Sequence, residues 1–422
     1  MSFFRGRPAF ARLFAASFVS QVGTQVTVLV LPLLALNSLH ASTMQVSILG
    51  FVEFIPFLLV GLQAGAIVDR RERVALMLVC DAVRAIALLS IPLAWYLGVR
   101  HLWLLLAVAL VVGTATVFFD VAAQSFLPEI VVASDLGPAN QVLAVGESVS
   151  RSGGPALGGL LARILSGPTA ILADVFSYVV SFLLLLRSRA APVPAPPVDA
   201  TDGPSLRTQI VEGLTFIRHH PTLAPLVMTM TALNLFGSIQ TAVLVTFMVR
   251  TLHYSPLVVG IMFAIGNLGS VVGGSVSIRI LDRLGLGRAL WQFVFVAGVG
   301  STVAAFAHGS RSYLLFGAAF CLVTFSAVIS NVAQVSYRQA VTPARLQGRM
   351  NATFRFLAWG ISPIGFLMGG YFGTVLGVRN AMLIAGLAQL FPWMLLRYSA
   401  VNDLTSLADV QADVSEGALV AR

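Results

Sequence analysis

The chain has 422 residues, of which 57% are hydrophobic and only 10% are charged, and its formal net charge is +9. A soluble domain carries about 25% charged residues, so this composition excludes a soluble protein and indicates one that crosses a membrane several times. All 26 basic residues are arginines. ATP binding of the Walker type needs a lysine against the phosphates and is therefore excluded. The sequence has no basic run that would bind nucleic acid, and its two cysteines and six histidines lack metal-ligand spacing. We therefore expect no nucleic acid, no metal and no cofactor.

Apolar stretches of about 20 residues are long enough to cross a bilayer core of about 30 Å as helices. The sequence contains twelve such stretches, which predict an all-α membrane protein with twelve transmembrane helices. They lie at residues 10–38, 45–68, 74–99, 101–127, 138–164, 168–187, 222–250, 256–281, 288–308, 312–337, 349–376 and 379–398.

The arginines are distributed unevenly between the two sides of the predicted membrane. Loops on the side of the N-terminus hold most of them, whereas the opposite side holds only Arg100, Arg163, Arg250, Arg311 and Arg379. Because loops rich in arginine stay in the cytoplasm, we expect both termini to be cytoplasmic. One loop departs from this rule, since the connection between the fourth and fifth spans carries Glu129 and Asp135 but no arginine.

The longest break between apolar spans divides the chain into halves. It begins with a proline-rich stretch at 192–197, which favours an extended spacer, and ends with apolar residues at helical spacing between Leu206 and Ile217. We predict a six-helix bundle, a cytoplasmic linker with an amphipathic helix, a second six-helix bundle and a cytoplasmic tail. These parts cover residues 1–187, 188–221, 222–398 and 399–422.

A pair of glycines four residues apart recurs in both halves of the chain. In a membrane helix, this spacing lets another helix backbone approach closely. The first and third copies, and likewise the second and fourth, are separated by nearly half the chain, which is typical of the internal repeats of transporters. The four copies are Gly61 with Gly65, Gly154 with Gly158, Gly269 with Gly273, and Gly365 with Gly369.

Two motifs resemble those of the major facilitator superfamily. Between the second and third spans, the residues Gly65, Asp69, Arg70 and Arg73 match G-x-x-x-D-R-x-x-R. In the fifth span, Gly154, Pro155, Gly158 and Gly159 match the G-P-x-x-G-G of drug/proton antiporters. The linker segment 212–218 is similar to that of the branch that includes macrolide and enterobactin exporters. One feature departs from the antiporters, because the fourth span has no arginine between Val111 and Phe119.

The resemblance implies two pseudo-symmetric six-helix bundles that work by alternating access. It also implies a monomeric, proton-coupled exporter of drug-like or natural-product amphiphiles in the lipid bilayer of a bacterial cytoplasmic membrane. In similar transporters, the first motif is a conformational latch, here Gly65, Asp69, Arg70 and Arg73 together with Asp120 near the cytoplasmic end of the fourth span. The simpler alternative is that the arginines set topology and that Asp120 caps a helix.

Several ionisable residues fall at membrane depth, where each costs on the order of 3 kcal/mol unless it is paired or hydrated. Spacings of three and four residues predict intrahelical pairs of Asp81 with Arg84 and of Glu147 with Arg151. Glu53 has no local partner in the sequence and is the leading candidate for proton coupling, the alternative being a buried, hydrogen-bonded glutamate. Asp174 also has no local partner and is a further candidate for proton coupling, although its place near the outer end of the sixth span leads us to expect hydration. The paired residues Asp81, Arg84, Glu147 and Arg151 are candidates for proton coupling as well.

Neutral polar residues mark the spans that the resemblance places around the substrate cavity. With few charges and scattered amides, this wall suits a bulky amphiphile. The candidates are Gln21, Thr24, Gln25, Asn234, Gln240, Asn267, Asn331, Gln334 and, as the only deeply placed charge of the second half, Arg355.

Three other functions are consistent with parts of this pattern. The chain could transport a lysophospholipid or a siderophore, or it could be a transporter-like receptor that moves no solute. An enzyme is disfavoured, because the segment 146–150 lacks the final glycine of G-x-S-x-G and lies within a helix.

Overall fold

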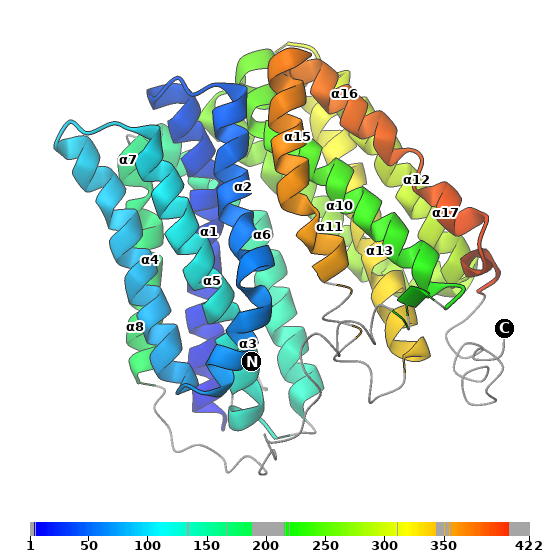
Figure 1. Ribbon diagram of the computed structural model, residues 1–422, viewed down its shortest axis with the longest axis horizontal. Coiled ribbons are helices and arrows are strands. Elements are labelled where there is room, and N and C mark those ends of the chain that lie inside the picture. Colours follow the sequence, from blue (N-terminus) through cyan, green and yellow to red (C-terminus); the bar gives the residue numbers. More distant parts are fainter. Residues whose placement is uncertain are drawn as a thin grey trace. The chain divides into compact units, whose positions relative to one another are not determined.

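The computed structural model describes residues 4, 6–132, 135–165, 167–187, 215, 217–218, 220–309, 311–342, 350, 354 and 356–404. Within these residues, every regular element is helical (Figure 1). The first half contains α1 (Pro8–Ser38), α2 (Thr43–Leu59), α3 (Gly61–Asp69), α4 (Arg73–Tyr96), α5 (Leu102–Ile130), α6 (Leu136–Ile164), α7 (Gly167–Ala170) and α8 (Leu172–Leu186). The second half contains α10 (Leu223–Thr246), the π-helix η3 (Phe247–Thr251), α11 (Pro256–Leu284), α12 (Leu286–Ala305), α13 (Tyr313–Val341), α15 (Ser362–Val375), α16 (Val378–Gln389), α17 (Trp393–Arg397) and the 3₁₀-helix η4 (Ala400–Asp403).

The twelve predicted spans coincide with these helices, some of which are broken. Nine helices in the described part of the chain are long and apolar enough to cross a membrane. The second span is divided into α2 and α3 at Val60, four residues after Pro56, and the sixth into α7 and α8 at Ile171. α6 spans 29 residues but is less apolar, because it carries Glu147, Arg151 and Arg163.

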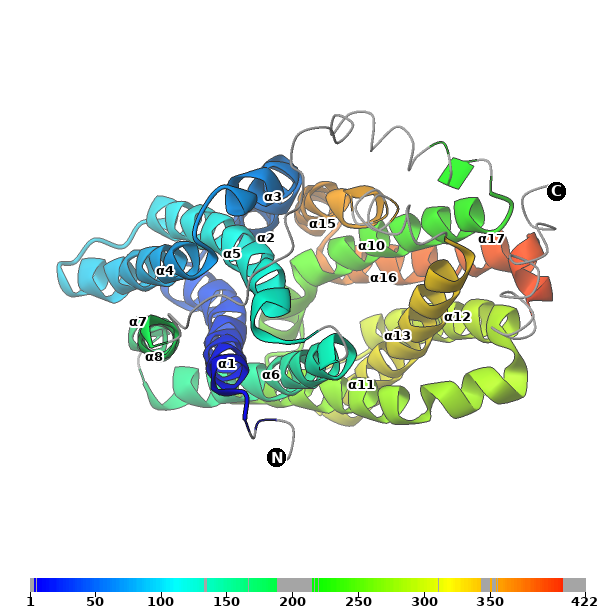
Figure 2. The same ribbon diagram turned by 90° about the horizontal axis from the view of Figure 1, so that it is seen from below.

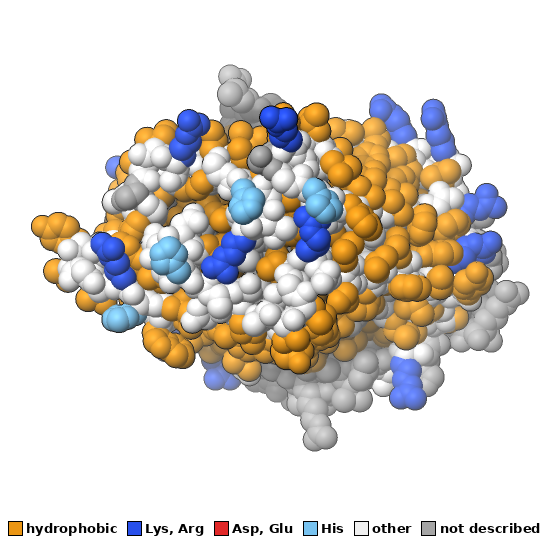
Figure 3. Space-filling model, turned by 90° about the horizontal axis from the view of Figure 1, so that it is seen from above, with side chains coloured by type: hydrophobic (Ala, Val, Ile, Leu, Met, Phe, Trp, Pro, Cys, Tyr) orange, Lys and Arg blue, Asp and Glu red, His pale blue; other side chains and the backbone are white. Residues whose placement is uncertain are grey.

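Many large apolar side chains remain exposed along the helices, which is the reverse of a soluble protein. Ile86 on α4, Phe176 on α8 and Ile278 on α11 are about 70% exposed, at 70%, 68% and 68%. Figure 3 looks onto one end of the molecule and shows arginine and histidine side chains among neutral ones, with hydrophobic side chains around them. Exposed apolar surface of this extent is explained by lipid contact.

The chain divides into two compact units. The N-terminal unit comprises Met1–Asp199 with Tyr254–Ala264, and the C-terminal unit comprises Ala200–His253 with Ile265–Arg422. In the N-terminal unit, α1 packs against α6 and α8, α4 against α5 and α8, and α2 against α5 (Figure 2). In the C-terminal unit, α10 packs against α15 and α16, and α12 against α13 and α16. Most of the predicted linker and tail lies outside the described residues.

The first residues of the predicted tail pack onto the C-terminal unit. Val401 is fully buried, the backbone N–H of Gly287 donates to the carbonyl of Leu404 at 2.9 Å, and the indole of Trp291 donates to Asn402 at 3.1 Å. These contacts hold η4 against α12.

Three of the four glycine pairs lie at close helix crossings. Gly154 and Gly158 of α6 face Gln25 and Val26 of α1, and the neighbouring Gly159 meets the backbone of Gly260 at the start of α11. Gly269 and Gly273 of α11 face α13 at Cys321 and Phe325, and Gly365 and Gly369 of α15 face α10 at Leu235 and Ile239. Pro155 takes part in the crossing of α6 with α11, because its carbonyl oxygen lies 2.7 Å from where a Cβ of Gly260 would stand.

The first pair has no close partner among the residues that the structure describes. A Cβ at Gly61 or at Gly65 would meet none of their atoms within 4 Å. A G-x-x-x-G spacing permits a close crossing but does not require one, and a partner helix must also be present on that face.

The glycine pairs generate a matched test of close packing. At Gly369, a Cβ would stand 2.5 Å from the carbonyl oxygen of Ile239, and this backbone atom cannot move without shifting α10. We expect Gly369→Ala to lower stability by about 1–3 kcal/mol, the usual cost of overpacking. Gly61→Ala is the control and should be neutral or slightly stabilising, since alanine favours the helix. Thermal unfolding in detergent compares the two, and equal melting temperatures would contradict the packing assignment.

Candidate functional site

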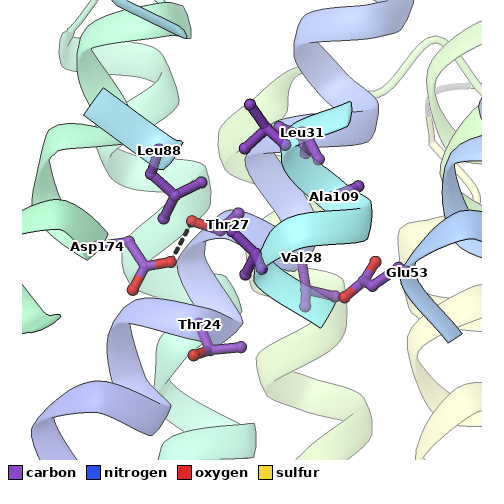
Figure 4. A pocket seen from close by; sticks show the side chains of 10 residues that line it. Thr24, Thr27, Val28, Leu31, Glu53, Leu88, Ala109 and Asp174 are labelled. Atoms are coloured by element: carbon purple, nitrogen blue, oxygen red, sulfur yellow. Dashed lines mark hydrogen bonds between the residues drawn. The ribbon is translucent and has the colours of Figure 1, made fainter. Parts of the chain in front are cut away.

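A small cavity lies inside the N-terminal unit. Its volume of about 20 Å³ has room for a water molecule. Two carboxylic acids line it, Glu53 from α2 and Asp174 from α8, and Figure 4 shows them on either side of the α1 segment that carries Thr24, Thr27 and Val28. The complete lining is Thr24, Thr27, Val28, Leu31, Glu53, Leu88, Val108, Ala109, Val112 and Asp174.

Glu53 is held at the cavity by a close crossing of α2 and α5. The position of a Cβ on Gly113 of α5 would be 2.6 Å from the backbone carbonyl oxygen of Glu53, so only glycine permits this contact. The Glu53 side chain is partly buried, and no arginine of the described residues forms an ion pair with it. Glu53 is therefore an acid without a fixed counter-charge, as its sequence context predicts.

Asp174 is fully buried, so the expectation that it is hydrated is wrong. The hydroxyl of Thr27 on α1 donates to its Oδ2 at 2.5 Å, and the hydroxyl of Ser177 donates to its Oδ1 at 2.9 Å. The cause is the close approach of α8 to α1 at Gly23, where a side chain would collide with both Asp174 and Ser177. Proximity to the end of a span does not hydrate a residue that faces a neighbouring helix.

A buried ion pair lies next to this acid. Arg84 and Asp81 of α4 bond to each other, at 2% and 0% exposure, as their spacing predicts. Ser181 of α8 donates to the second oxygen of Asp81 at 2.7 Å. The Arg84 guanidinium also lies over two rings, 4.2 Å from the centroid of Tyr178 and 4.3 Å from that of Phe119.

Hydroxyl groups of α8 donate to both Asp174 and Asp81 and so connect these two acids into one polar cluster. Tyr178 is fully buried and its hydroxyl is 2.9 Å from that of Thr24, which also donates to the Ser20 carbonyl. The sequence analysis missed Thr27, Ser177, Tyr178 and Ser181. A signal for three of them was present, since Asp174, Ser177, Tyr178 and Ser181 follow the i, i+3, i+4, i+7 pattern of one helix face in an otherwise apolar segment.

The second predicted pair lies in a different environment. Arg151 donates to Glu147 at 2.7 and 3.0 Å, but the two side chains are 56% and 48% exposed. An exposed pair of this kind contributes little to stability. Glu147 does not line the cavity, whose two acids are Glu53 and Asp174.

Two arginines at helix ends form ion pairs with acids that are not part of the predicted latch. Arg73, the first residue of α4, pairs with Glu129 near the end of α5, whereas Asp120 is exposed. Arg7 pairs with Asp135 in the same way. The two acids of the arginine-free loop are thus partners of arginines elsewhere, which explains why that loop departs from the positive-inside pattern. Asp69 ends α3, and its side chain lies outside the described part.

The substrate-cavity candidates divide into three groups. Gln240 on α10 is bound within its own bundle, because it accepts from Gln389 at 3.0 Å and donates to the Ser301 carbonyl at 3.1 Å. Asn234 donates to the Met230 carbonyl one turn earlier at 2.9 Å. These two amides are therefore structural. Gln21, Gln25 and Asn267 are partly buried, and Asn331 is exposed.

Gln334 is 2% exposed, and its amide nitrogen has no hydrogen-bond partner among the residues that the structure describes. The hydroxyls of Ser330 and Ser326, one and two turns earlier on the same face of α13, also have no hydrogen-bond partner among the described residues. Arg355 lies outside the described residues.

Comparison with known proteins agrees with this architecture. A sequence model of the Major Facilitator Superfamily matches residues 13–365. The multidrug efflux pump Tap of Mycolicibacterium fortuitum is 26% identical over 396 residues, which cover 91% of this chain and 93% of Tap. Macrolide efflux protein A of Streptococcus pyogenes is 22% identical over 355 residues, covering 82% of this chain and 84% of that protein. A crystal structure of the nucleoside transporter NupG has a TM-score of 0.71 at 13% identity and covers 92% of this chain and 99% of that chain, a likeness of fold alone.

The pairing of Arg73 can be measured by a double-mutant cycle. Because the two side chains are 29% and 17% exposed, we expect Arg73→Gln and Glu129→Gln to couple by on the order of 1 kcal/mol in detergent unfolding. The matched cycle of Arg73→Gln with Glu147→Gln should be additive, because Glu147 is paired with Arg151. Additive effects of Arg73→Gln and Glu129→Gln would contradict the pairing described above.

Proposed function

This chain belongs to the major facilitator superfamily and is a multi-pass membrane transporter rather than an enzyme, and on that premise we propose that it is a proton-coupled exporter. Its substrates would be drug-like or natural-product amphiphiles. It would act as a monomer in a bacterial cytoplasmic membrane, with both termini in the cytoplasm. The efflux function of the named relatives and their coverage of this chain support export as the direction.

The observation that carries the proposal is the position of Glu53. It lines a cavity inside a lipid-embedded bundle and forms no ion pair among the described residues. An uncompensated carboxylate in such surroundings costs several kcal/mol, and a bound proton removes that cost. A group that binds a proton in one conformation and releases it in another is what an antiporter requires.

The choice of an amphiphile rests on the charges of the second half. Between residues 222 and 398, Asp282 is the only acid in the sequence, and it stands at the end of α11. Of the amides of that half, Gln240 and Gln389 bond to each other, whereas the Gln334 amide nitrogen on α13 has no hydrogen-bond partner among the described residues. Apolar walls with a few amide and hydroxyl groups bind large, mostly apolar molecules.

We expect Glu53→Gln to uncouple transport from the proton gradient. Glutamine resembles the protonated acid, so counterflow of ethidium, an amphiphilic cation, should persist in proteoliposomes at equal pH. Accumulation driven by a pH gradient should fall to the level of empty vesicles. Glu147→Gln is the matched control, because this acid is exposed and paired, and it should accumulate ethidium like the wild type.

Intact gradient-driven accumulation in Glu53→Gln would remove Glu53 from the mechanism. Wild-type protein that binds ethidium without counterflow would instead favour the receptor alternative. Counterflow of a lysophospholipid or a siderophore, but not of ethidium, would favour the other transport alternatives.

The latch gives a different phenotype from the coupling acid. Asp69 is the last residue of α3 and Arg73 the first of α4, so the motif forms the whole connection between the second and third spans. If the latch is needed for every conformational cycle, Asp69→Asn should abolish counterflow and gradient-driven accumulation together, with expression and melting temperature unchanged. Wild-type counterflow in this variant would refute the latch.

A further inference from the structure

Resting on the proton-coupled function above, we propose that Asp174 is a second proton-binding residue, connected to Glu53 through the cavity, so that the N-terminal unit exchanges two protons in each transport cycle. The proposal stands on charge balance, on hydrogen-bond geometry and on the cavity that the two acids share.

The charge balance follows from the groups around Asp174. From α4 it faces Asp81 and Arg84, and from its own helix Tyr178, with Glu53 across the cavity. Its contacts on α1 are neutral hydroxyls. Arg84 is the one cation of this buried cluster, and it is committed to Asp81 by an ion pair.

If Asp174 and Glu53 were both ionised, neither would have a cation of its own among the described residues, because Arg84 is ion-paired with Asp81 and also lies near the exposed Asp120. A charge without a partner in such a place costs several kcal/mol. A proton bound to each of the two acids removes that cost and leaves the Asp81–Arg84 pair as it is.

The hydrogen bonds around Asp174 suit both of its protonation states. The Ser177 hydroxyl lies 2.9 Å from Oδ1 of Asp174 and 2.8 Å from the backbone carbonyl oxygen of the same residue. It can donate to the carboxylate when Asp174 is ionised. When Oδ1 carries a proton, the hydroxyl can donate to the carbonyl and accept from the acid. A purely structural carboxylate would not need a donor with two acceptors within reach.

The cavity supplies the connection between the two acids. It is large enough for a water molecule and offers polar partners from Thr24, Thr27, Glu53 and Asp174 (Figure 4). After Asp174 has released its own proton, the O–H bond of the Glu53 acid breaks and that proton binds to the water oxygen. The water releases another proton, which forms the O–H bond of Asp174. Glu53 is left as the carboxylate, and charge and atoms balance.

The competing arrangement is a permanently ionised Asp174. The residue lies in the first turn of α8, where the helix dipole favours a negative charge. In that case Asp174 would share Arg84 with Asp81 and would take no part in proton exchange. The two arrangements differ in the number of carboxyl groups that bind a proton.

Infrared difference spectroscopy of the full-length protein in lipid nanodiscs distinguishes them without any substrate. Between alkaline and acidic buffer, the wild type should show two bands of buried protonated carboxyl groups. Glu53→Gln should remove one band and Asp174→Asn the other. Glu147→Gln, an exposed acid, should leave both bands unchanged. Thr27→Val keeps the shape of the side chain and removes the hydroxyl, so it should displace the Asp174 band and spare the other.

Transport gives an independent readout. In proteoliposomes, Asp174→Asn should halve the number of protons exchanged per ethidium molecule, measured from the membrane potential at which net flux reverses. Both bands persisting in Asp174→Asn, or an unchanged proton ratio, would overturn the inference. Should Asp174→Asn fail to fold, a carboxyl spectrum of Thr27→Val that matches the wild type would overturn it equally.

Failure of the proposed function looks different from failure of this inference. Ethidium flux in the wild type that ignores the proton gradient would overturn proton coupling and the two-proton cycle with it. An absent Asp174 band, with Glu53→Gln behaving as expected, would overturn the role of Asp174 alone.

Discussion

The contact of α1 with α8 at Gly23 is the constraint on which the candidate site depends. No side chain larger than hydrogen fits there, because it would occupy the space of Asp174 and Ser177. The close approach brings the hydroxyls of Thr24 and Thr27 within hydrogen-bond distance of Tyr178 and Asp174. It also keeps Asp174 fully buried, at the edge of the small cavity that Glu53 lines as well. Backbone proximity, rather than any one polar interaction, builds the cluster.

The ion pairs at the helix ends are partly exposed, whereas the ion pair between Asp81 and Arg84 inside the bundle is buried. At the helix ends, Arg7 and Arg73 pair with Asp135 and Glu129 across helices, in partly exposed positions where each pair contributes little alone. Inside the bundle, the ion pair of Arg84 with Asp81 is almost fully buried and surrounded by aromatic rings and a serine hydroxyl. Breaking that pair would leave a buried charge and cost far more.

The sequence predicts what depends on local spacing and fails where a partner comes from elsewhere in the chain. The helical spans follow from apolar length, and the pairs Asp81–Arg84 and Glu147–Arg151 from spacing within one turn. The partner of Arg73 could not be predicted, because Glu129 is separated from it by two helices in the sequence. Burial of Asp174 could not be predicted either, because it depends on the close approach of α8 to Gly23 of α1. The pair Gly61 and Gly65 shows the converse, as its spacing is right but no atom of the described residues lies close to it.

The missing arginine of the fourth span has a physical counterpart in a neighbouring helix. Drug/proton antiporters carry an arginine in the fourth span, which is α5 here. In this chain, the segment of α5 from Val111 to Phe119 is entirely uncharged. In this chain, Arg84 projects from α4 so that its guanidinium lies 4.3 Å from the ring centroid of Phe119 on α5. The Arg84 guanidinium therefore contacts α5, although the residue belongs to α4. Its charge is held by Asp81 and by aromatic faces, which stabilise a guanidinium where water is scarce. Because this cation is already ion-paired with Asp81, the protons that we propose on Asp174 and Glu53 would compensate for the arginine that the fourth span lacks.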